Sequence, residues 1–389
     1  MRFIGYKYVE GRRVMVFVVI LVLSSMLFSM MAFSLLGFYR VFGGYLGGGN
    51  DIVVVYDRNS NTPFTGLIPI YLVENISSIK GVMAVSPEVI VPCVLKNESV
   101  FLRGIVPEDF VKLNQLVMVE GSMIRLDDLD SIIVGKNLAE RLDLKPGERV
   151  LVLSVFVNQY LELYVKGVFV SRSVMDDEIL APLYVGQWLR GTDYNYVTLM
   201  RVKVNSSMVD ASVIFEAIGA KSSSVGSSGV SQLFGGLLSW SRPSFKIENI
   251  GVNEGQKFME SYLSRYGVTK ESLIVLSVIV FLLCGVTIVV AFKTILVQHK
   301  GVVGILRSIG VSRKFLRVDL LFRLLFWSLF ASSIGIVLSL IVLSVMQAYG
   351  FLRVLSHTVL IYPDPLIIIL NFVLVFVIIL LVILRSDLE

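Results

Sequence analysis

Four long apolar runs interrupt a mixed pattern of hydrophobic and polar positions along the 389-residue chain. The runs cover residues 14–39, 273–292, 324–345 and 365–384. Each is close to the roughly 20 apolar residues that a helix needs to cross a bilayer. The stretch between the first run and the second, residues 40–268, mixes polar and apolar residues as folded domains do. The pattern therefore predicts an α-helical membrane protein with four transmembrane helices and a large domain inserted between helices 1 and 2.

Within residues 40–268, short β-branched runs are bounded by turn residues, and helical patterns lie between them. Helical stretches are expected at 70–79 and 136–144, and the Ser- and Gly-rich segment 219–236 has the composition of a mobile loop. The predicted strands are 51–57, 89–95, 100–105, 132–134, 150–156, 161–170 and 197–204. The inserted domain is therefore predicted to be α+β.

The distribution of Lys and Arg predicts the orientation in the membrane. Seven basic residues lie in 293–323, whereas 346–364 contains only Arg353. Because cytosolic loops are enriched in Lys and Arg, the loop 293–323 is expected inside and the loop 346–364 outside. The basic segment 1–13 then lies along the inner surface as a cytosolic amphipathic N-terminus, and the tail 385–389 is cytosolic.

This orientation predicts a multi-pass protein of the cell (plasma) membrane with both termini in the cytosol and residues 40–268 extracytoplasmic. A cleaved signal peptide is the alternative interpretation of the first run. Signal peptides have a shorter apolar stretch and a small-x-small cleavage site, to which residues 34–37 are a poor match.

Composition agrees with a membrane protein, since 55% of the residues are hydrophobic, 17% are charged and the mean hydropathy is +0.78. Soluble domains have about 45–50% apolar and about 25% charged residues. The net charge of +5 comes from residues that flank the apolar runs. No basic face with interleaved aromatic residues is present, so the expected partner is the lipid bilayer and not a nucleic acid.

The sequence contains no arrangement of residues that is typical of a catalytic or metal-binding site. His299 and His357, the two histidines, are predicted on opposite sides of the membrane, so a shared metal site or a triad is excluded and each is expected to be an ordinary interfacial residue. The acidic stretches 127–128 and 176–178 are expected to be solvated turns. Cys93 lies in the polar domain and the other cysteine in an apolar run, so no disulfide is expected. No Walker A loop is present to bind nucleotide phosphates. We therefore expect no catalytic, cofactor-binding or metal-binding residues in this chain.

The cytosolic loop 293–323 contains a short apolar face. Ile305, Leu306 and Ile309 have helical spacing, and basic residues surround them. An apolar face on a cytosolic loop needs a partner to cover it. The residues predicted to dock a partner there are Gly304, Ile305, Leu306, Arg307, Ile309, Gly310 and Arg313.

The order of one span, a large outside domain and three spans resembles the FtsX/MacB-like permeases of ABC transporters. The segment 304–312, Gly-Ile-Leu-Arg-Ser-Ile-Gly-Val-Ser, looks like the EIGILRAIGAS coupling segment of that family. Residues 81–87 resemble its GV-x-AVSP turn, and 165–169 its V-x-G-I-F strand. Residues 133–139 and 144–148 resemble its VG-x-x-LA and L-x-x-G-[DE] pair.

The chain departs from the family pattern in two places. Val302 stands where the family usually has a glutamate before Ile-Gly. The last residues, 385–389, differ from the family's Pro-x-x-Ala-Leu-Arg tail. An ion pair to the ATPase through that glutamate is therefore not expected here.

The resemblance implies a permease subunit without enzyme activity of its own, acting by mechanotransmission. A separate cytosolic ABC ATPase would bind ATP and Mg and dock on the coupling helix of 293–323. Its action would move the extracytoplasmic MacB-like domain and export or extract a peptide, lipid-linked or lipoprotein substrate. The permease would pair with itself or with a similar permease. The alternative functions are a membrane-tethered receptor or scaffold acting without an ATPase and, third, a membrane-bound hydrolase.

Overall fold

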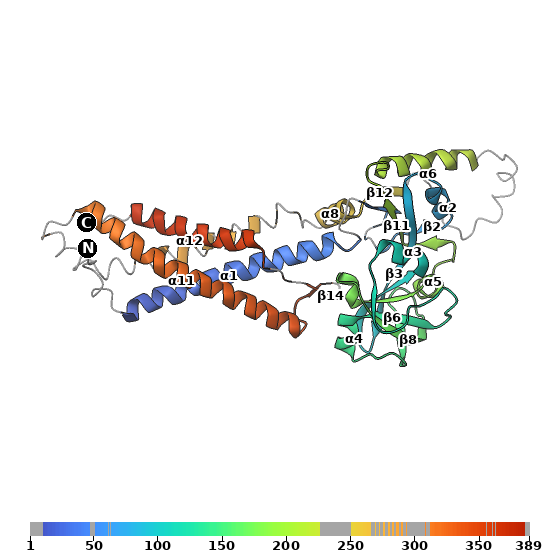
Figure 1. Ribbon diagram of the computed structural model, residues 1–389, viewed down its shortest axis with the longest axis horizontal. Coiled ribbons are helices and arrows are strands. Elements are labelled where there is room, and N and C mark those ends of the chain that lie inside the picture. Colours follow the sequence, from blue (N-terminus) through green and yellow to red (C-terminus); the bar gives the residue numbers. More distant parts are fainter. Residues whose placement is uncertain are drawn as a thin grey trace. The chain divides into compact units, whose positions relative to one another are not determined.

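The structure is a computed structural model, drawn in Figure 1. It describes residues 11–46, 51–60, 62, 64–225, 250–265, 312–354, 356–359, 361 and 363–385, together with scattered residues between 269 and 308. The chain divides into two compact units. The helical unit comprises Met1–Tyr39, Val268–Leu352 and Val359–Glu389, and the sheet domain comprises Arg40–Gly267 and Arg353–Thr358.

Three long helices make up most of the described helical unit: α1 (Gly11–Gly43), α11 (Arg313–Ala348) and α12 (Pro365–Arg385). By length and composition, Val18–Val41 in α1 and Leu325–Ala348 in α11 can cross a membrane, while α12 holds a shorter apolar stretch. The predicted span 273–292 lies largely outside the described residues. The count of four spans therefore stays a prediction.

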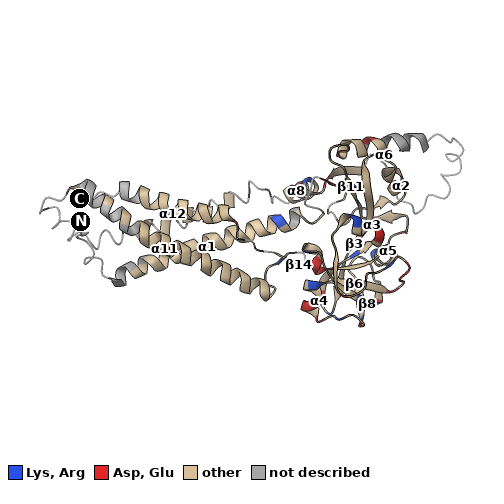
Figure 2. Cartoon of the chain, in the orientation of Figure 1, with Lys and Arg blue, Asp and Glu red and all other residues tan. Residues whose placement is uncertain are grey.

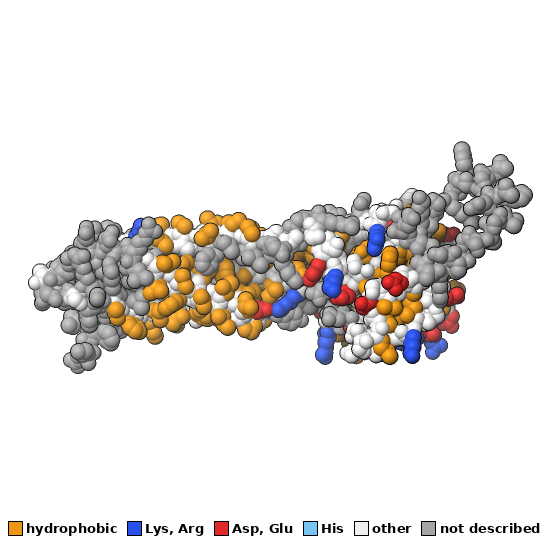
Figure 3. Space-filling model, turned by 90° about the horizontal axis from the view of Figure 1, so that it is seen from above, with side chains coloured by type: hydrophobic (Ala, Val, Ile, Leu, Met, Phe, Trp, Pro, Cys, Tyr) orange, Lys and Arg blue, Asp and Glu red, His pale blue; other side chains and the backbone are white. Residues whose placement is uncertain are grey.

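These helices are apolar on their outer surface as well as where they meet. Phe33, Ile336, Leu343 and Ile367 form the buried core between them. Large apolar side chains also cover the outside, as Figure 3 shows, and Phe322 is 64% exposed. Figure 2 shows that the described parts of the helices carry almost no charge. A helix that is apolar all round is typical of a membrane span or of a large protein core.

Small and neutral polar residues lie where the helices contact one another. The amide nitrogen of Asn371 on α12 donates to the carbonyl oxygen of Ser25 (3.2 Å) and to Ser29 Oγ (2.8 Å), both on α1. A Cβ atom at Gly335 of α11 would lie only 2.7 Å from the carbonyl oxygen of Val22. Glycine at 335 therefore permits a close approach of α11 to α1 that a larger residue would prevent.

The sheet domain is built on a ten-stranded sheet in the order β12-β1-β11-β3-β4-β9-β6-β8-β5, with β7 paired to β3 and β8. The β4–β9 and β6–β8 pairs are parallel, and the other pairs are antiparallel. The strands are β1 (Ile52–Asp57), β3 (Val82–Leu95), β4 (Glu98–Ile105), β5 (Val117–Gly121), β6 (Ser131–Gly135), β7 (Arg149–Ser154), β8 (Tyr160–Val170), β9 (Glu178–Pro182), β11 (Leu199–Val204) and β12 (Ile250–Glu254).

Short helices and two small sheets complete the described domain. The helices are α2 (Leu72–Ser77), α3 (Pro107–Leu113), α4 (Lys136–Leu142), the 3-10 helix η1 (Val174–Asp177), α5 (Leu183–Arg190), α6 (Ala211–Val225) and α8 (Gly255–Arg265). The small sheets pair β2 (Ile68–Pro69) with β10 (Tyr196–Val197), and β13 (Arg353–Val354) with β14 (His357–Thr358). The α+β class predicted for this domain is confirmed.

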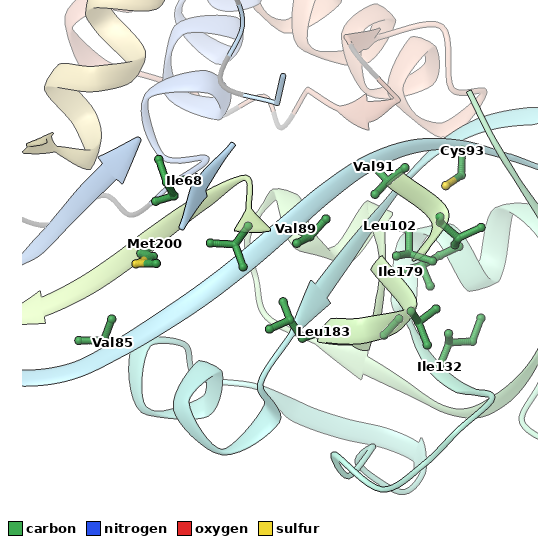
Figure 4. Packing of buried hydrophobic residues seen from close by; sticks show 14 of the residues in the cluster. Ile68, Val85, Val89, Val91, Cys93, Leu102, Ile132, Ile179, Leu183 and Met200 are labelled. Carbon is green, nitrogen blue, oxygen red and sulfur yellow. The ribbon is translucent and has the colours of Figure 1, made fainter. Parts of the chain in front are cut away.

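The central strands contribute side chains to two cores, because successive residues of a strand point to opposite faces. Val89 on β3, Leu102 on β4 and Ile179 on β9 belong to the larger core, part of which Figure 4 shows. Ile105 on β4 and Leu180 on β9 belong to a smaller core on the other face. Burial on both faces explains why these strands are continuous apolar runs in the sequence.

The seven predicted strands and both predicted helices are present, with shifted ends. Two local predictions were wrong. Residues 81–87 are not a turn as a whole: Gly81 alone has a positive φ (+100°), and β3 begins at Val82. Residues 219–225 belong to helix α6 and not to a loop, because the helical pattern that starts at Ala211 continues through them. The remainder of the predicted loop, 226–236, lies outside the described residues.

Candidate functional site

The predicted docking residues are mostly outside the part of the chain that the structure describes. This holds for Gly304, Ile305, Leu306, Arg307, Ile309 and Gly310. Arg313 is the first residue of α11. The docking surface on the loop 293–323 therefore stays a prediction.

A group of buried charged side chains lies in the sheet domain, and the sequence did not lead us to expect it. Arg103 on β4 lies between two carboxylates, with Nη1 2.6 Å from Glu88 Oε2 and Nε 2.7 Å from Glu178 Oε2. The side chains of these three residues are 0% exposed. Arg201 on β11 contacts the other oxygen of Glu88 at 2.5 Å. We call Glu88, Arg103, Glu178 and Arg201 the charge cluster.

The register of four neighbouring strands brings the charge cluster together. Arg103 is opposite Ile90 in the β3–β4 pair, so it shares a sheet face with Glu88, two residues away from Ile90. Arg201 is opposite Ser86, and Phe101 is opposite Glu178, which places both charges on this same face. The alternation of side chains thus puts one charged residue from each of β11, β3, β4 and β9 in a row beside the smaller core.

Electrostatics keep Arg103 and Glu178 ionised despite their burial. Burial acts to raise the pKa of Glu178, but the Arg103 guanidinium and the hydrogen bond with His357 outweigh it and hold the pKa well below its usual range. Burial acts to lower the pKa of Arg103, but Glu178 and Glu88 together with Tyr45 raise it overall. Glu178 is therefore a charged hydrogen-bond acceptor at neutral pH, with no proton to give as a general acid.

A hairpin from far along the chain binds beside this cluster. His357 on β14 is 3% exposed, and its Nε2 lies 3.0 Å from Glu178 Oε1. The backbone N–H of Thr358 donates to Asp177 Oδ2 at 2.8 Å. The imidazole also stacks on Phe101, with ring centroids 5.4 Å apart.

Two predictions about these residues were therefore wrong. The acidic stretch 176–178 is not a solvated turn, because Asp176, Asp177 and Glu178 are 8%, 1% and 0% exposed. His357 is not an ordinary interfacial residue. In both cases the residues that make burial possible come from elements distant in the sequence. The polarity of the neighbouring residues alone therefore predicted exposure where the structure shows burial.

A metal or redox site finds no support in the described residues. Among them, no group of three or more His, Cys, Asp or Glu side chains is arranged to hold a metal ion. Cys93 is a buried free thiol on β3, and burial raises its pKa to about 12, which makes the thiolate inaccessible at neutral pH.

Comparison with known proteins relates the C-terminal part of the chain to one family. Residues 274–386 match the family described as FtsX-like permease C-terminal. This range includes the apolar helices α11 and α12. The C-terminal part of the chain is an FtsX-like permease domain, and the resemblance inferred from the sequence is confirmed. No curated protein matches the chain.

Solved structures that resemble the chain have low sequence identity to it. The periplasmic region of MacB from Actinobacillus actinomycetemcomitans is 15% identical, with a TM-score of 0.35, and the match covers 55% of this chain and 92% of that one. The extracellular domain of the ABC-type transporter YknZ from Gram-positive bacteria is 17% identical, with a TM-score of 0.33, and the match covers 43% and 95% of the two chains.

Proposed function

We propose that the chain is the membrane subunit of an ABC transporter, and that it couples ATP hydrolysis by a separate cytosolic ATPase to movement of its sheet domain. The observation that carries this proposal is the family match, because residues 274–386 include the whole loop 293–323. The basic, partly apolar loop therefore belongs to the permease domain. ATP and Mg would be bound by the ATPase, since this sequence has no Walker A loop.

The proposed orientation has both termini in the cytosol and the sheet domain outside. The concentration of seven Lys and Arg residues in 293–323 supports it. The permease pairs with a second copy or with a similar permease, and the transporter exports or extracts a peptide, a lipid-linked compound or a lipoprotein. These finer points rest on what FtsX/MacB-like permeases have in common.

Docking on the loop is proposed to depend mainly on apolar burial. Val302 replaces the family's glutamate, so a carboxylate is missing at that position. Burying an aliphatic side chain contributes about 1.5–3 kcal/mol. Ile305, Leu306 and Ile309 together would then supply most of the affinity, with Arg307 and Arg313 at the rim.

The test is co-purification of the full chain with its ATPase from native membranes. The ATPase is recognised by mass spectrometry as a protein with a Walker A motif. In a variant with Ile305→Asp, Leu306→Asp and Ile309→Asp, we expect the association to weaken by about a thousandfold or more, because three buried apolar side chains are replaced by charges.

A matched control carries the same three charges on the sheet domain. Val117, Val119 and Leu129 are 64%, 52% and 80% exposed, so aspartate at these positions is tolerated. This control is expected to retain the ATPase. Retention of the ATPase by the loop variant would overturn the docking surface. Absence of any Walker A protein from the wild-type complex would favour a receptor or scaffold that works without an ATPase.

A further inference from the structure

Part of the connection between α11 and α12 belongs to the sheet domain. The chain leaves the helical unit after Leu352 and returns to it at Val359. Between these residues it forms the β13–β14 hairpin, in which Arg353 is opposite Thr358. The two long helices are thus joined through a segment that packs with the sheet domain.

Three carboxylates of the sheet domain hold this hairpin. Glu178 contacts His357, as described above, and Asp177 accepts hydrogen bonds from the backbone N–H and from Oγ1 of Thr358, the latter at 3.1 Å. Arg353 Nη1 lies 3.3 Å from Glu98 Oε2.

An arginine of the sheet domain fixes each of these carboxylates in turn. Arg141 contacts Glu98 at 2.9 Å and Asp177 at 2.7 Å, and Arg103 contacts Glu178. Because each carboxylate already contacts an arginine of the sheet domain, its position is fixed when it accepts a hydrogen bond from the hairpin.

The segment that follows α1 reaches the same carboxylate. Tyr45 is buried, and its hydroxyl donates to Glu178 Oε1 at 2.6 Å. The Tyr45 ring also meets the His357 imidazole edge-on, with centroids 5.2 Å apart. One oxygen atom of Glu178 therefore contacts both Tyr45 and His357, which come from two separate connections to the helices.

We propose that the hairpin Arg353–Thr358 is a strap, and that Glu178 is the fastening point it shares with Tyr45. Through Glu178, the segment after α1 and the connection between α11 and α12 are held to strand β9, so that both move together with the sheet domain. This inference deepens the proposed function, because it names a route by which movement of the helices reaches the domain. It rests on that function only for the source of the movement.

A shared fastening point predicts reciprocal coupling. If Tyr45 and His357 stabilise each other through Glu178, removal of either one loosens the other by the same free energy. A residue that only fills space in the core would instead loosen its whole surroundings. These two cases can be separated by measuring local opening at each segment.

The experiment is amide hydrogen exchange on the full-length chain in lipid nanodiscs, without any ATPase. His357→Ala leaves the buried Arg103–Glu178 ion pair in place. We expect exchange in 353–358 to rise about tenfold or more, as expected for the loss of a hydrogen bond to a charged group. Exchange at Tyr45 and Leu46 is expected to rise about threefold or more.

The reciprocal variant is Tyr45→Phe, which removes only the hydroxyl group. It is expected to raise exchange in 353–358 about threefold or more, while β3 and β4 exchange as in the wild type. The control for it is Tyr160→Phe, whose side chain is 64% exposed. The control for His357→Ala is Phe351→Ala, which is 75% exposed and lies just before the hairpin. His357→Gln retains a donor for Glu178 and is expected to restore slow exchange.

Two outcomes would overturn the strap. The first is unchanged exchange of 353–358 in Tyr45→Phe, and the second is an equal rise throughout β3 and β4 in His357→Ala. Neither outcome depends on the ATPase. Conversely, the strap can be present in a protein whose loop variant still binds its ATPase, so failure of the proposed function is seen in the co-purification and not here.

Discussion

The helical unit and the sheet domain both bury polar groups, but they do so with different chemistry. In the helical unit, the buried polar residues that the structure describes are serines and Asn371, all neutral. In the sheet domain they include full charges, with Glu88, Arg103 and Glu178 at 0% exposure. A neutral amide or hydroxyl is satisfied by one or two hydrogen bonds, whereas a buried charge also needs a partner of opposite sign.

The difference follows from how each unit fixes its geometry. Strand ladders hold neighbouring side chains at set positions, so Arg103 on β4 meets carboxylates on the adjacent strands β3 and β9. Helices contact one another only through side chains and close backbone approaches such as that at Gly335.

The largest effect is expected from Arg103→Met, which keeps the apolar contacts but leaves Glu88 and Glu178 with less positive charge between them. Breaking a buried ion pair costs about 3–5 kcal/mol. The free energy of unfolding of the sheet domain should fall by this amount. It can be measured by urea denaturation of a full chain in which Trp240 and Trp327 are replaced by phenylalanine, so that Trp188 is the single tryptophan.

Arg149→Met is the control for this prediction. Arg149 is 55% exposed and lies 3.3 Å from Asp130, so its loss should change the free energy of unfolding by less than about 1 kcal/mol. Equal effects of the two substitutions would show that a buried arginine contributes no more to the free energy of unfolding than an exposed one.

A second difference should appear in acid. The pKa of Glu178 is lowered in the folded domain, so its stabilisation is complete above the unfolded value of about 4.3 and is lost as pH falls below it. The buried polar residues described in the helical unit do not titrate in this range. We expect the Trp188 signal to lose stability from about pH 4 downward, while that of Trp327 on α11 stays constant.

At pH 4 this loss should be smaller than that of Arg103→Met, because the carboxyl of the unfolded chain is only partly protonated at that pH. Two chains, each with one of these tryptophans and phenylalanine at the other tryptophan positions, report the two units separately. Parallel acid unfolding of both signals would contradict the comparison.

In the helical unit, an effect smaller than that of Arg103→Met is expected from Gly335→Ala. The new Cβ atom would lie 2.7 Å from a backbone oxygen, so α11 must move away from α1. Overpacking of this kind costs about 1–3 kcal/mol. The thermal midpoint of the Trp327 signal should fall, and the Trp188 signal should be unchanged.

Gly285→Ala provides a milder case in the same unit. Its Cβ atom would meet the flexible end of Ile378 at 3.1 Å, and that side chain can turn aside. A midpoint as low as that of Gly335→Ala would mean that the close backbone approach at Gly335 has no special importance.

The sequence was a good guide wherever structure depends on a local pattern. The apolar runs at 14–39, 324–345 and 365–384 fall in long helices, and β4 follows from its short, largely apolar run of residues. The FtsX-like resemblance was also correct, because a motif made of consecutive residues, such as 304–312, can be recognised without knowledge of the fold.

The charge cluster was missed because its members are far apart in the sequence and each looks ordinary alone. Glu178 and Arg103 are 75 positions apart, and Glu178 and His357 are 179 apart. One signal was available. Arg103 and Arg201 each interrupt an apolar strand, and an arginine in such a strand predicts a buried carboxylate nearby. Which carboxylate it meets depends on strand order, which the sequence pattern did not provide.

The hairpin Arg353–Thr358 has a consequence for biosynthesis. A ribosome makes residues 40–267 long before it makes the hairpin, so the nascent domain has Glu178 without His357 and Asp177 without Thr358. These last contacts form only after α11 has been synthesised and the chain has turned back. Completion of the domain therefore waits for the synthesis of α11, and in a chain truncated before residue 353 Asp177 would lack Thr358 and Glu178 would lack His357.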